Sequence, residues 1–241
     1  MNILAFDTAS ISGAVAIMKD DKIIAHTQLN IGLTHSEQLL PTVHSLMEMT
    51  GMTMAELDAV AITCGPGSFT GLRIGFSTAK GMALGLGKPL IPISTLDVLA
   101  QNGKGVNGLI VPIMNARRNQ VYTAIYKSDG AAVQRKSDYQ AIGIDVLLQE
   151  IKKLPEVSQV YFTGDGVDYF EDVVRDALKE KAIFAEGCRK YVCADMLAQL
   201  AKDEKSHWQD LQGMRVEPIY LRESEAVIKW REAHPGENIE D

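Results

Sequence analysis

The chain of 241 residues has no excess of positive charge. Its 24 Lys and Arg stand against 31 Asp and Glu, which gives a formal net charge of −7 and a pI near 5.3. A protein that binds RNA or DNA on its own usually shows a basic surface, because it must neutralise phosphates. The acidic balance therefore disfavours a free-standing nucleic-acid-binding module and leaves room only for a local basic patch.

The sequence is also poor in cysteine. Cys64, Cys188 and Cys193 form neither an even set nor a C-x-x-C pair, so we predict neither a disulfide framework nor a zinc site. We interpret them as reduced thiols of a cytoplasmic protein. Cys64 is predicted to be a buried small residue and not a nucleophile, because no base lies near it in the sequence.

Long apolar runs are missing as well. No stretch approaches the roughly 18 residues of a membrane span. The chain begins with a strand pattern and not with a basic segment and an apolar core, so we expect no signal peptide and no membrane association. The whole chain is 46% hydrophobic and 23% charged. This is an ordinary globular composition, with room for one large or two small domains.

The most informative segment is residues 65–75, which read Gly-Pro-Gly-Ser-Phe-Thr-Gly-Leu-Arg-Ile-Gly. It follows a predicted strand at 59–63 and opens a predicted helix that runs to about Leu86. It matches neither the Walker A loop nor the dinucleotide-binding fingerprint. The segment therefore predicts a strand–loop–helix unit without a common nucleotide motif.

This glycine loop has two interpretations. Gly65 and Gly67 allow a sharp turn, and Ser68 or Thr70 can cap the helix that follows. Free N–H groups and a positive dipole end at a helix N-terminus suit a phosphate, and Arg73 lies one turn further along. The loop is either an anion or nucleotide site or a tight turn packed against its neighbour.

The order of elements repeats along the chain. Three strands between Ile3 and Ala25, a helix at 34–50, the strand at 59–63 and the glycine-loop helix form a βββαβα unit. After a glycine-rich break at 103–108 the same order partly returns. Two such copies are the plan of the actin-like ATPase (ribonuclease H-like) fold. We therefore predict an α/β protein with two duplicated βββαβα lobes.

The predicted boundaries follow from this repeat. Residues 1–104 form the first lobe, and residues 105–193 form a second, degenerate lobe. A helix and a strand within 194–222 pack back on the first lobe. The charged tail, 223–241, is predicted to be poorly ordered or ordered only by a partner.

Asp7 ends the first predicted strand. In actin-like ATPases an aspartate at this place binds the metal–phosphate complex through water. The alternative is that Asp7 caps a turn by accepting backbone N–H groups. The two interpretations separate an enzyme from a protein that only keeps the fold of one.

Two helices have the pattern of either a core or a contact surface. The helix at 34–50 begins with a capping box, Thr34-x-x-Glu37, and carries an apolar stripe. The glycine-loop helix carries small residues one turn apart, which allow another backbone to come close. The candidate contact residues are His35, Leu39, Val43, Met47, Gly71, Gly75 and Ala79.

Several motifs together resemble the bacterial TsaB (YeaZ) family over nearly the whole chain, to about Arg222. They are Ile3-x-x-Phe6-Asp7-Thr8, His35-Ser36-Glu37-x-Leu39-Leu40-Pro41, the long glycine loop at 65–75, Ala79-Lys80-Gly81, Asn115-Ala116-Arg117-Arg118-x-x-Val121-Tyr122 and Tyr220-Leu221-Arg222. The second lobe departs from the family at Asn115, where Asp is common, and at Asn119-Gln120, where Gly-Glu is usual.

The resemblance implies a non-catalytic partner of the enzyme TsaD. With the ATPase TsaE, the two install threonylcarbamoyl, donated by threonylcarbamoyl-AMP, on the tRNA adenosine next to the anticodon. It implies docking through the two helices, to TsaD or to a second copy when TsaD is absent. It also implies that tRNA is reached only through the complex and that ATP is used by the partners, with no cofactor on this chain alone.

The sequence itself separates a partner from an enzyme. The catalytic paralogue carries a His-x-x-x-His metal pair, and Thr95 and Leu99 occupy the aligned positions here. We therefore expect no metal site and no catalytic residue. The alternative is an actin-like nucleotide-binding enzyme, an ATPase or a metallopeptidase, that acts alone. Arg117 and Arg118, at a predicted hairpin, either point into solvent or meet tRNA phosphate in the assembled complex.

Overall fold

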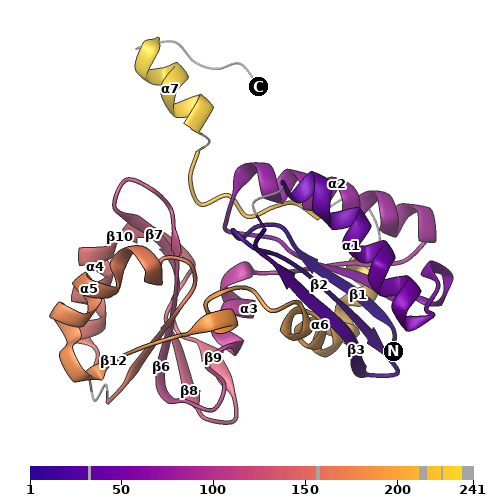
Figure 1. Cartoon of the computed structure of the whole chain (residues 1–241). Helices are drawn as coiled ribbons and strands as arrows, with labels where there is room; N and C mark the ends of the chain where they lie inside the picture. The colour runs from indigo at the N-terminus through magenta and orange to yellow at the C-terminus, as the bar shows by residue number, and fades with distance from the viewer. Residues whose placement is uncertain (32–33, 156–157, 212–215, 224, 235–241) are drawn as a thin grey trace.

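The computed structural model describes residues 1–31, 34–155, 158–211, 216–223 and 225–234 (Figure 1). It has two lobes that lie side by side, and each lobe is a sheet covered by helices. No helix within the described part of the chain combines the length and the apolar character needed to cross a bilayer.

The first lobe is built on a five-stranded sheet of order β3-β2-β1-β4-β5. Its strands are β1 (Ile3–Asp7), β2 (Gly13–Lys19), β3 (Lys22–Leu29), β4 (Ala59–Thr63) and β5 (Leu90–Ile93). Helices α1 (His35–Thr50) and α2 (Phe69–Leu86) cover one face, and α6 (Ala194–Asp203) covers the other (Figure 1). Helix α6 comes after the strands of the second sheet in the chain, yet it packs on β1 and β2.

The second lobe has a sheet whose main path is β10-β7-β6-β11-β12, with β8 paired to β6 and β9 paired to β8. Its strands are β6 (Asn107–Asn115), β7 (Gln120–Thr123), β8 (Tyr126–Asp129), β9 (Val133–Arg135), β10 (Gln140–Gly143), β11 (Val160–Thr163) and β12 (Ala182–Phe184). Helices α4 (Ile144–Lys153) and α5 (Val167–Leu178) cover its outer face, and α3 (Thr95–Gln101) lies against β6 on the inner side. The short 3-10 helices are η1 (Met54–Glu56), η2 (Lys179–Lys181), η3 (Gly187–Lys190) and η4 (Glu204–Leu211).

The two sheets share one strand order. Numbered within each main path, both run third, second, first, fourth, fifth, with antiparallel pairs first and parallel pairs after. The prediction of a duplicated α/β fold is therefore confirmed. The second lobe differs from a bare βββαβα unit because β8 and β9 add a hairpin between its second and third strands.

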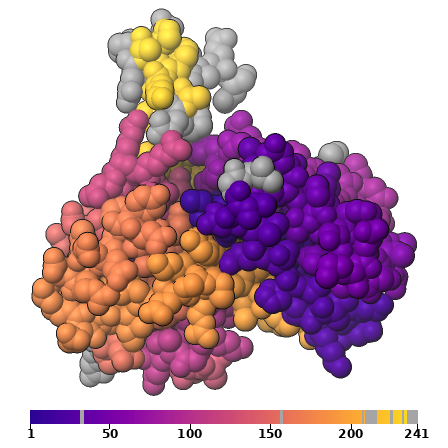
Figure 2. Space-filling model, in the orientation of Figure 1, coloured from indigo at the N-terminus to yellow at the C-terminus, as the bar shows by residue number. Residues whose placement is uncertain are grey.

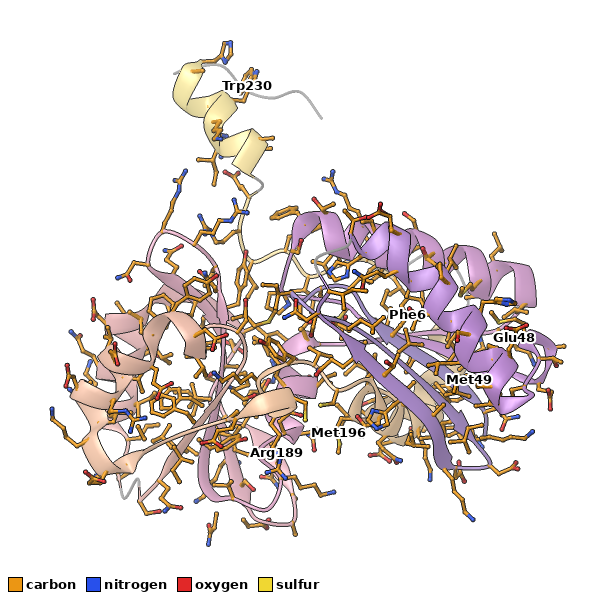
Figure 3. The ribbon with its side chains drawn as sticks, viewed as in Figure 1. Phe6, Glu48, Met49, Arg189, Met196 and Trp230 are labelled. Atoms are coloured by element: carbon orange, nitrogen blue, oxygen red, sulfur yellow. The ribbon has the colours of Figure 1, made fainter. Side chains whose placement is uncertain are left out.

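Burial follows the period of two expected of a strand covered on both faces. Ile3 and Ala5 of β1 belong to the core between the sheets, whereas Leu4 and Phe6 belong to the core beneath α1 and α2. A third core lies between the second sheet and the pair α4 and α5. Figure 3 shows Phe6 between sheet and helices, with Glu48 and Met49 on the outer side of α1.

The predicted helix ends are confirmed. Helix α1 begins with the Thr34–Glu37 capping box and ends at Gly51, whose φ of 64° suits a residue without a Cβ. Helix α2 begins at the cap Ser68, whose side chain accepts the N–H of Gly71.

The C-terminal part corrects one expectation. Residues 216–222, predicted to contain a strand, cross from one lobe to the other without joining either sheet. The tail, predicted to be poorly ordered or ordered only by a partner, contains the helix α7 (Glu225–Ala233), which stands away from both lobes (Figure 1). On α7 the ring of Trp230 stacks on His234. Residues 235–241 lie outside the described part.

Candidate functional site

The Asp7 carboxylate is fully buried where β1 ends. One of its oxygens accepts the N–H of Ala9 and the hydroxyl of Thr63, and the other accepts the N–H and the hydroxyl of Ser10. Burial raises the pKa of this carboxyl, and the hydrogen bonds from Ser10, Thr63 and Ala9 lower it in part. The carboxylate is thus held by the chain's own donors, as the turn-capping interpretation predicts.

The glycine loop rests on the turn that follows Asp7. A Cβ on Gly67 would lie 2.3 Å from the carbonyl oxygen of Ala9, and that oxygen accepts the N–H of Ser68 at 2.8 Å. Gly65 has a φ of 101°, and a Cβ there would lie 2.6 Å from the carbonyl oxygen of Ile219. The loop therefore needs glycine for close packing within the chain, whether or not it also binds an anion.

A cleft of about 560 Å³ separates the two lobes beside this loop. In Figure 2 the first lobe, in indigo and purple, lies beside the second lobe, which is mainly orange. The first lobe and its C-terminal crossing segment contribute Ala9, Ser10, Ile11, His35, Gly67, Ser68, Phe69, Thr70, Arg222 and Glu223. The second lobe contributes Met114, Asn115, Ala116, Arg117, Tyr122 and Asp165.

Asp165 is the strongly shifted carboxyl of this cleft, and the sequence analysis missed it. Burial raises its pKa to about 6, while the hydrogen bond from the N–H of Asn115 opposes the rise. The signal in the sequence that could have found it is an acidic residue between two glycines, Gly164-Asp165-Gly166, directly after a strand. A cleft carboxyl that titrates near pH 6 makes this surface sensitive to pH.

The small residues predicted as a contact stripe on α2 face the protein's own first loop. A Cβ on Gly71 would lie 1.9 Å from the carbonyl oxygen of Thr8, and one on Gly75 would lie 2.2 Å from its hydroxyl. The Thr8 hydroxyl donates to the carbonyl oxygen of Gly71 at 2.8 Å. Ala79 is completely buried. The stripe does bring another backbone close, but that backbone belongs to the same chain.

The apolar stripe of α1 is likewise turned inward. Leu39, Val43 and Met47 are buried against the first sheet. His35 is half-buried, and its Nε2 lies 3.0 Å from the carbonyl oxygen of Ser10. Leu39, Val43 and Met47 thus serve the core, and His35 lines the cleft wall. Val43 and Met47 also line a groove on the outer side of the helices, so contact with a partner through these residues stays a prediction.

The outer face of α1 and α2 presents other apolar side chains. Leu40 is 53% exposed, Met49 79% and Leu84 72%. Between the helices lies a groove that ends in a cluster of methionines. Its lining is Leu40, Val43, His44, Met47, Glu48, Gly51, Met52, Thr53, Met54 and Met82.

The positions aligned with the metal-binding histidines of the paralogue carry Thr95 and Leu99, which are not metal-ligating residue types. Thr95 and Leu99 lie in the core between the sheets. Among the described residues, no group of three or more His, Cys, Asp or Glu is arranged to hold a metal ion. The Cys64 thiol is buried as predicted, and desolvation raises its pKa to about 12, which keeps it protonated.

The arginines singled out in the sequence are exposed. Arg73 lies on the outer side of α2, while Arg117 and Arg118 lie in the hairpin between β6 and β7. Arg117, Arg118 and Asn119 are three successive residues with positive φ, at 61°, 51° and 59°. Such a run without glycine is uncommon and strained.

Comparisons with known proteins agree with this architecture. The family model described as TsaD: tRNA N6-adenosine threonylcarbamoyltransferase matches residues 30–230. The tRNA threonylcarbamoyladenosine biosynthesis protein TsaB of Bacillus subtilis (strain 168) is 33% identical over 233 residues, which cover 97% of this chain and 99% of that relative.

Solved structures show the same fold. YeaZ from Pseudomonas aeruginosa matches 91% of this chain and 99% of its own, with a TM-score of 0.76 and 23% identity. The inorganic polyphosphate/ATP-glucomannokinase from Arthrobacter sp. strain KM matches 84% of this chain and 99% of its own, with a TM-score of 0.51 and 14% identity. The architecture is that of the actin-like ATPases. Because the family model covers most of the chain and the Bacillus relative matches nearly all of it, this chain belongs to the TsaB (YeaZ) family.

Proposed function

We propose that this protein is a non-catalytic subunit that docks TsaD and, with TsaE, supports threonylcarbamoyl transfer to the tRNA adenosine adjacent to the anticodon. The matching family model and the biosynthetic role in the name of the Bacillus relative support this proposal. No cofactor is assigned to this chain, and ATP is used by the partners.

The state of Asp7 carries the proposal. An aspartate that serves a metal–phosphate complex must present its charge to the cleft, whereas Asp7 is buried and accepts hydrogen bonds from Ala9, Ser10 and Thr63. Both carboxylate oxygens thus find their hydrogen-bond donors within the chain. The residue has the place of a catalytic aspartate and the environment of a structural one.

The outer face of α1 and α2 is the proposed docking surface for TsaD, or for a second copy when TsaD is absent. Leu40, Met49 and Leu84 leave apolar area exposed there, and the adjacent groove is rich in methionine. Flexible methionines adapt to different partners, which suits a surface that exchanges one occupant for another.

Mass-resolved size exclusion of this protein, alone and mixed with TsaD and TsaE, tests the proposal. Formation of threonylcarbamoyladenosine is followed in the same fractions. We expect a complex with an activity that neither protein has alone. A lack of complex, or comparable activity from this chain alone, would refute the proposal. Binding of Mg–ATP by the isolated chain that is lost in Asp7→Ala would instead establish a nucleotide-binding enzyme.

Charged substitutions locate the surface. Leu40→Glu and Leu84→Glu should each weaken the TsaD complex by at least about tenfold while the fold is retained, because a buried unpaired carboxylate costs several kcal/mol. Val43→Glu or Ala79→Glu would not serve, since both side chains are buried in the core. Tyr169→Glu on α5 is the matched control, because Tyr169 is 61% exposed on the other lobe. Equal weakening by the control would remove α1 and α2 as the docking surface.

A further inference from the structure

Positive side chains collect at the mouth of the interlobe cleft, although the chain as a whole is acidic. Arg117 and Arg222 line the cleft, and Arg118 follows Arg117 in the same hairpin. Arg73 lies one helical turn after Phe69, another cleft residue, on α2. We call Arg73, Arg117, Arg118 and Arg222 the arginine rim.

The hairpin holds its arginines outward. The side-chain oxygen of Asn115 accepts the N–H of Arg117 at 2.9 Å, and the carbonyl oxygen of Asn119 accepts the N–H of Ile144 at 3.3 Å. Between these anchors the backbone turns with positive φ, and Arg117 and Arg118 are both exposed. Backbone strain of this kind persists only where the surroundings enforce it.

The segment that crosses between the lobes completes the rim. Arg222 donates to the carbonyl oxygen of Ala116, which places it beside the hairpin arginines. Two residues earlier, Tyr220 stacks on Phe69 with ring centroids 4.5 Å apart and an interplanar angle of 8°. Tyr220 remains 41% exposed. The aromatic pair therefore joins α2, which carries Arg73, to the crossing segment, which carries Arg222.

The carboxyl groups of the same cleft have other hydrogen-bond partners. Asp165 accepts the N–H of Asn115, and Glu223 forms an ion pair with Arg231 of α7 at 2.6 Å. The four arginines of the rim outnumber the two carboxylates of the cleft, so this surface is positive although the chain as a whole carries −7.

We infer that the arginine rim contacts the phosphate backbone of the tRNA, with Tyr220 offering a ring face to an unpaired base; this rests on the proposed function. Guanidinium groups bind phosphate oxygens in a bidentate manner, and aromatic faces stack on bases of any sequence. The exposed tyrosine favours RNA over an acidic protein surface. Because the whole chain is acidic, the contact operates only when TsaD brings the tRNA to it.

Binding of a fluorescently labelled tRNA transcript to the purified complex of this chain with TsaD tests the inference. Arg117→Ala/Arg118→Ala should weaken binding by on the order of tenfold and lower the slope of log affinity against log salt by about 2. Arg73→Ala should lower that slope by about 1. The matched control is Lys152→Ala/Lys153→Ala on α4, which removes the same charge from an exposed face of the second lobe.

The outcomes separate the inference from the proposed function. If no complex with TsaD forms, the proposed function fails before tRNA is added. If the complex forms and the rim and control variants bind tRNA equally, the inference is wrong and the proposed function stands. A loss of TsaD or TsaE binding in the rim variants, with unchanged tRNA affinity, would also overturn it, because the rim would then be a protein contact.

Discussion

The two lobes share one strand order and differ in chemistry where their first strands end. Strand β1 ends in Asp7, a buried carboxylate that caps the following turn with help from Ser10 and Thr63. Strand β6 ends in Asn115, whose side-chain oxygen caps its turn by accepting the backbone N–H of Arg117. The comparison teaches that the duplicated backbone survives while each lobe secures its turn by different side chains.

The glycine turns make the same point. In the first lobe Gly67 lies against the carbonyl oxygen of Ala9, and in the second Gly166 lies against that of Ile113. Each turn gives one backbone N–H to that oxygen, from Ser68 at 2.8 Å and from Gly166 at 2.9 Å. Within the described residues, the first lobe adds a helix that packs its glycines on the loop, and the second adds a half-buried carboxyl, Asp165, between the glycines of its turn.

The largest expected effect comes from breaking the helix contact peculiar to the first lobe. Gly71→Ala places a methyl group 1.9 Å from the carbonyl oxygen of Thr8. We expect the free energy of unfolding to fall by about 3 kcal/mol or more, because neither backbone can move away freely. Urea denaturation measures the change.

Gly85→Ala is the control on the same helix. A Cβ at Gly85 meets nothing within 4 Å, so the variant should gain roughly 0.5–1 kcal/mol from helix propensity. Similar losses in both variants would mean that glycine in α2 has no packing role against the first loop.

The next largest effect is expected from Asp165→Asn, which removes the carboxyl found in the glycine turn of the second lobe. The pKa of Asp165 lies near 6 in the folded protein, above its ordinary value of 3.8, because the group is buried. Its contribution to stability is therefore fully present below about pH 4 and is lost as pH rises through about 6, a change of about 3 kcal/mol. Asp165→Asn should be about 2 kcal/mol more stable than the wild type near pH 7.

The test is the pH dependence of the stability difference between Asp165→Asn and the wild type. Asp7 titrates in the same direction and is present in both proteins, so the quantity to follow is the difference between the two unfolding free energies. It should vanish or reverse near pH 4 and be largest above about pH 6. A difference that does not vary with pH would contradict a raised pKa at Asp165.

The smallest expected effect comes from Asp7→Asn, which gives the end of β1 the same side chain that Asn115 gives the end of β6. Asp7→Asn replaces one acceptor oxygen by an NH2 group that faces donors from Ala9 and Thr63 or from Ser10. One backbone N–H then loses its partner, at a cost of about 1–2 kcal/mol in thermal or urea unfolding. An unchanged stability would show that the carboxylate is not needed for the turn.

Much of the first lobe could be predicted because its signals are local. The glycine loop, the Thr34–Glu37 capping box and the cap Ser68 each act within a few residues, and all lie where we expected. The facing of α2 could not be predicted. Small residues one turn apart indicate that a backbone comes close, but Thr8 lies more than sixty positions away and leaves no mark in the local pattern.

The second lobe was harder for the same reason. Strands β8 and β9 form a short hairpin, and the Asp97 carboxylate of α3 accepts the hydroxyls of Tyr126 and Tyr139 at 2.7 and 2.6 Å. These partners, 29 and 42 positions away, tie the lobes together without any shared motif. Helix α7 was not expected because the tail 223–241 as a whole contains more charged than apolar residues, a composition that indicates disorder.

The isolated position of α7 has an optical consequence. The chain contains two tryptophans. Trp208 is buried and donates to the carbonyl oxygen of Ala201, whereas Trp230 stands on α7 against His234 (Figure 3). A soluble quencher should dim the emission of Trp230 and leave that of Trp208 nearly untouched. The protein thus carries one built-in fluorophore for its body and one for its outlying helix, each readable without a label.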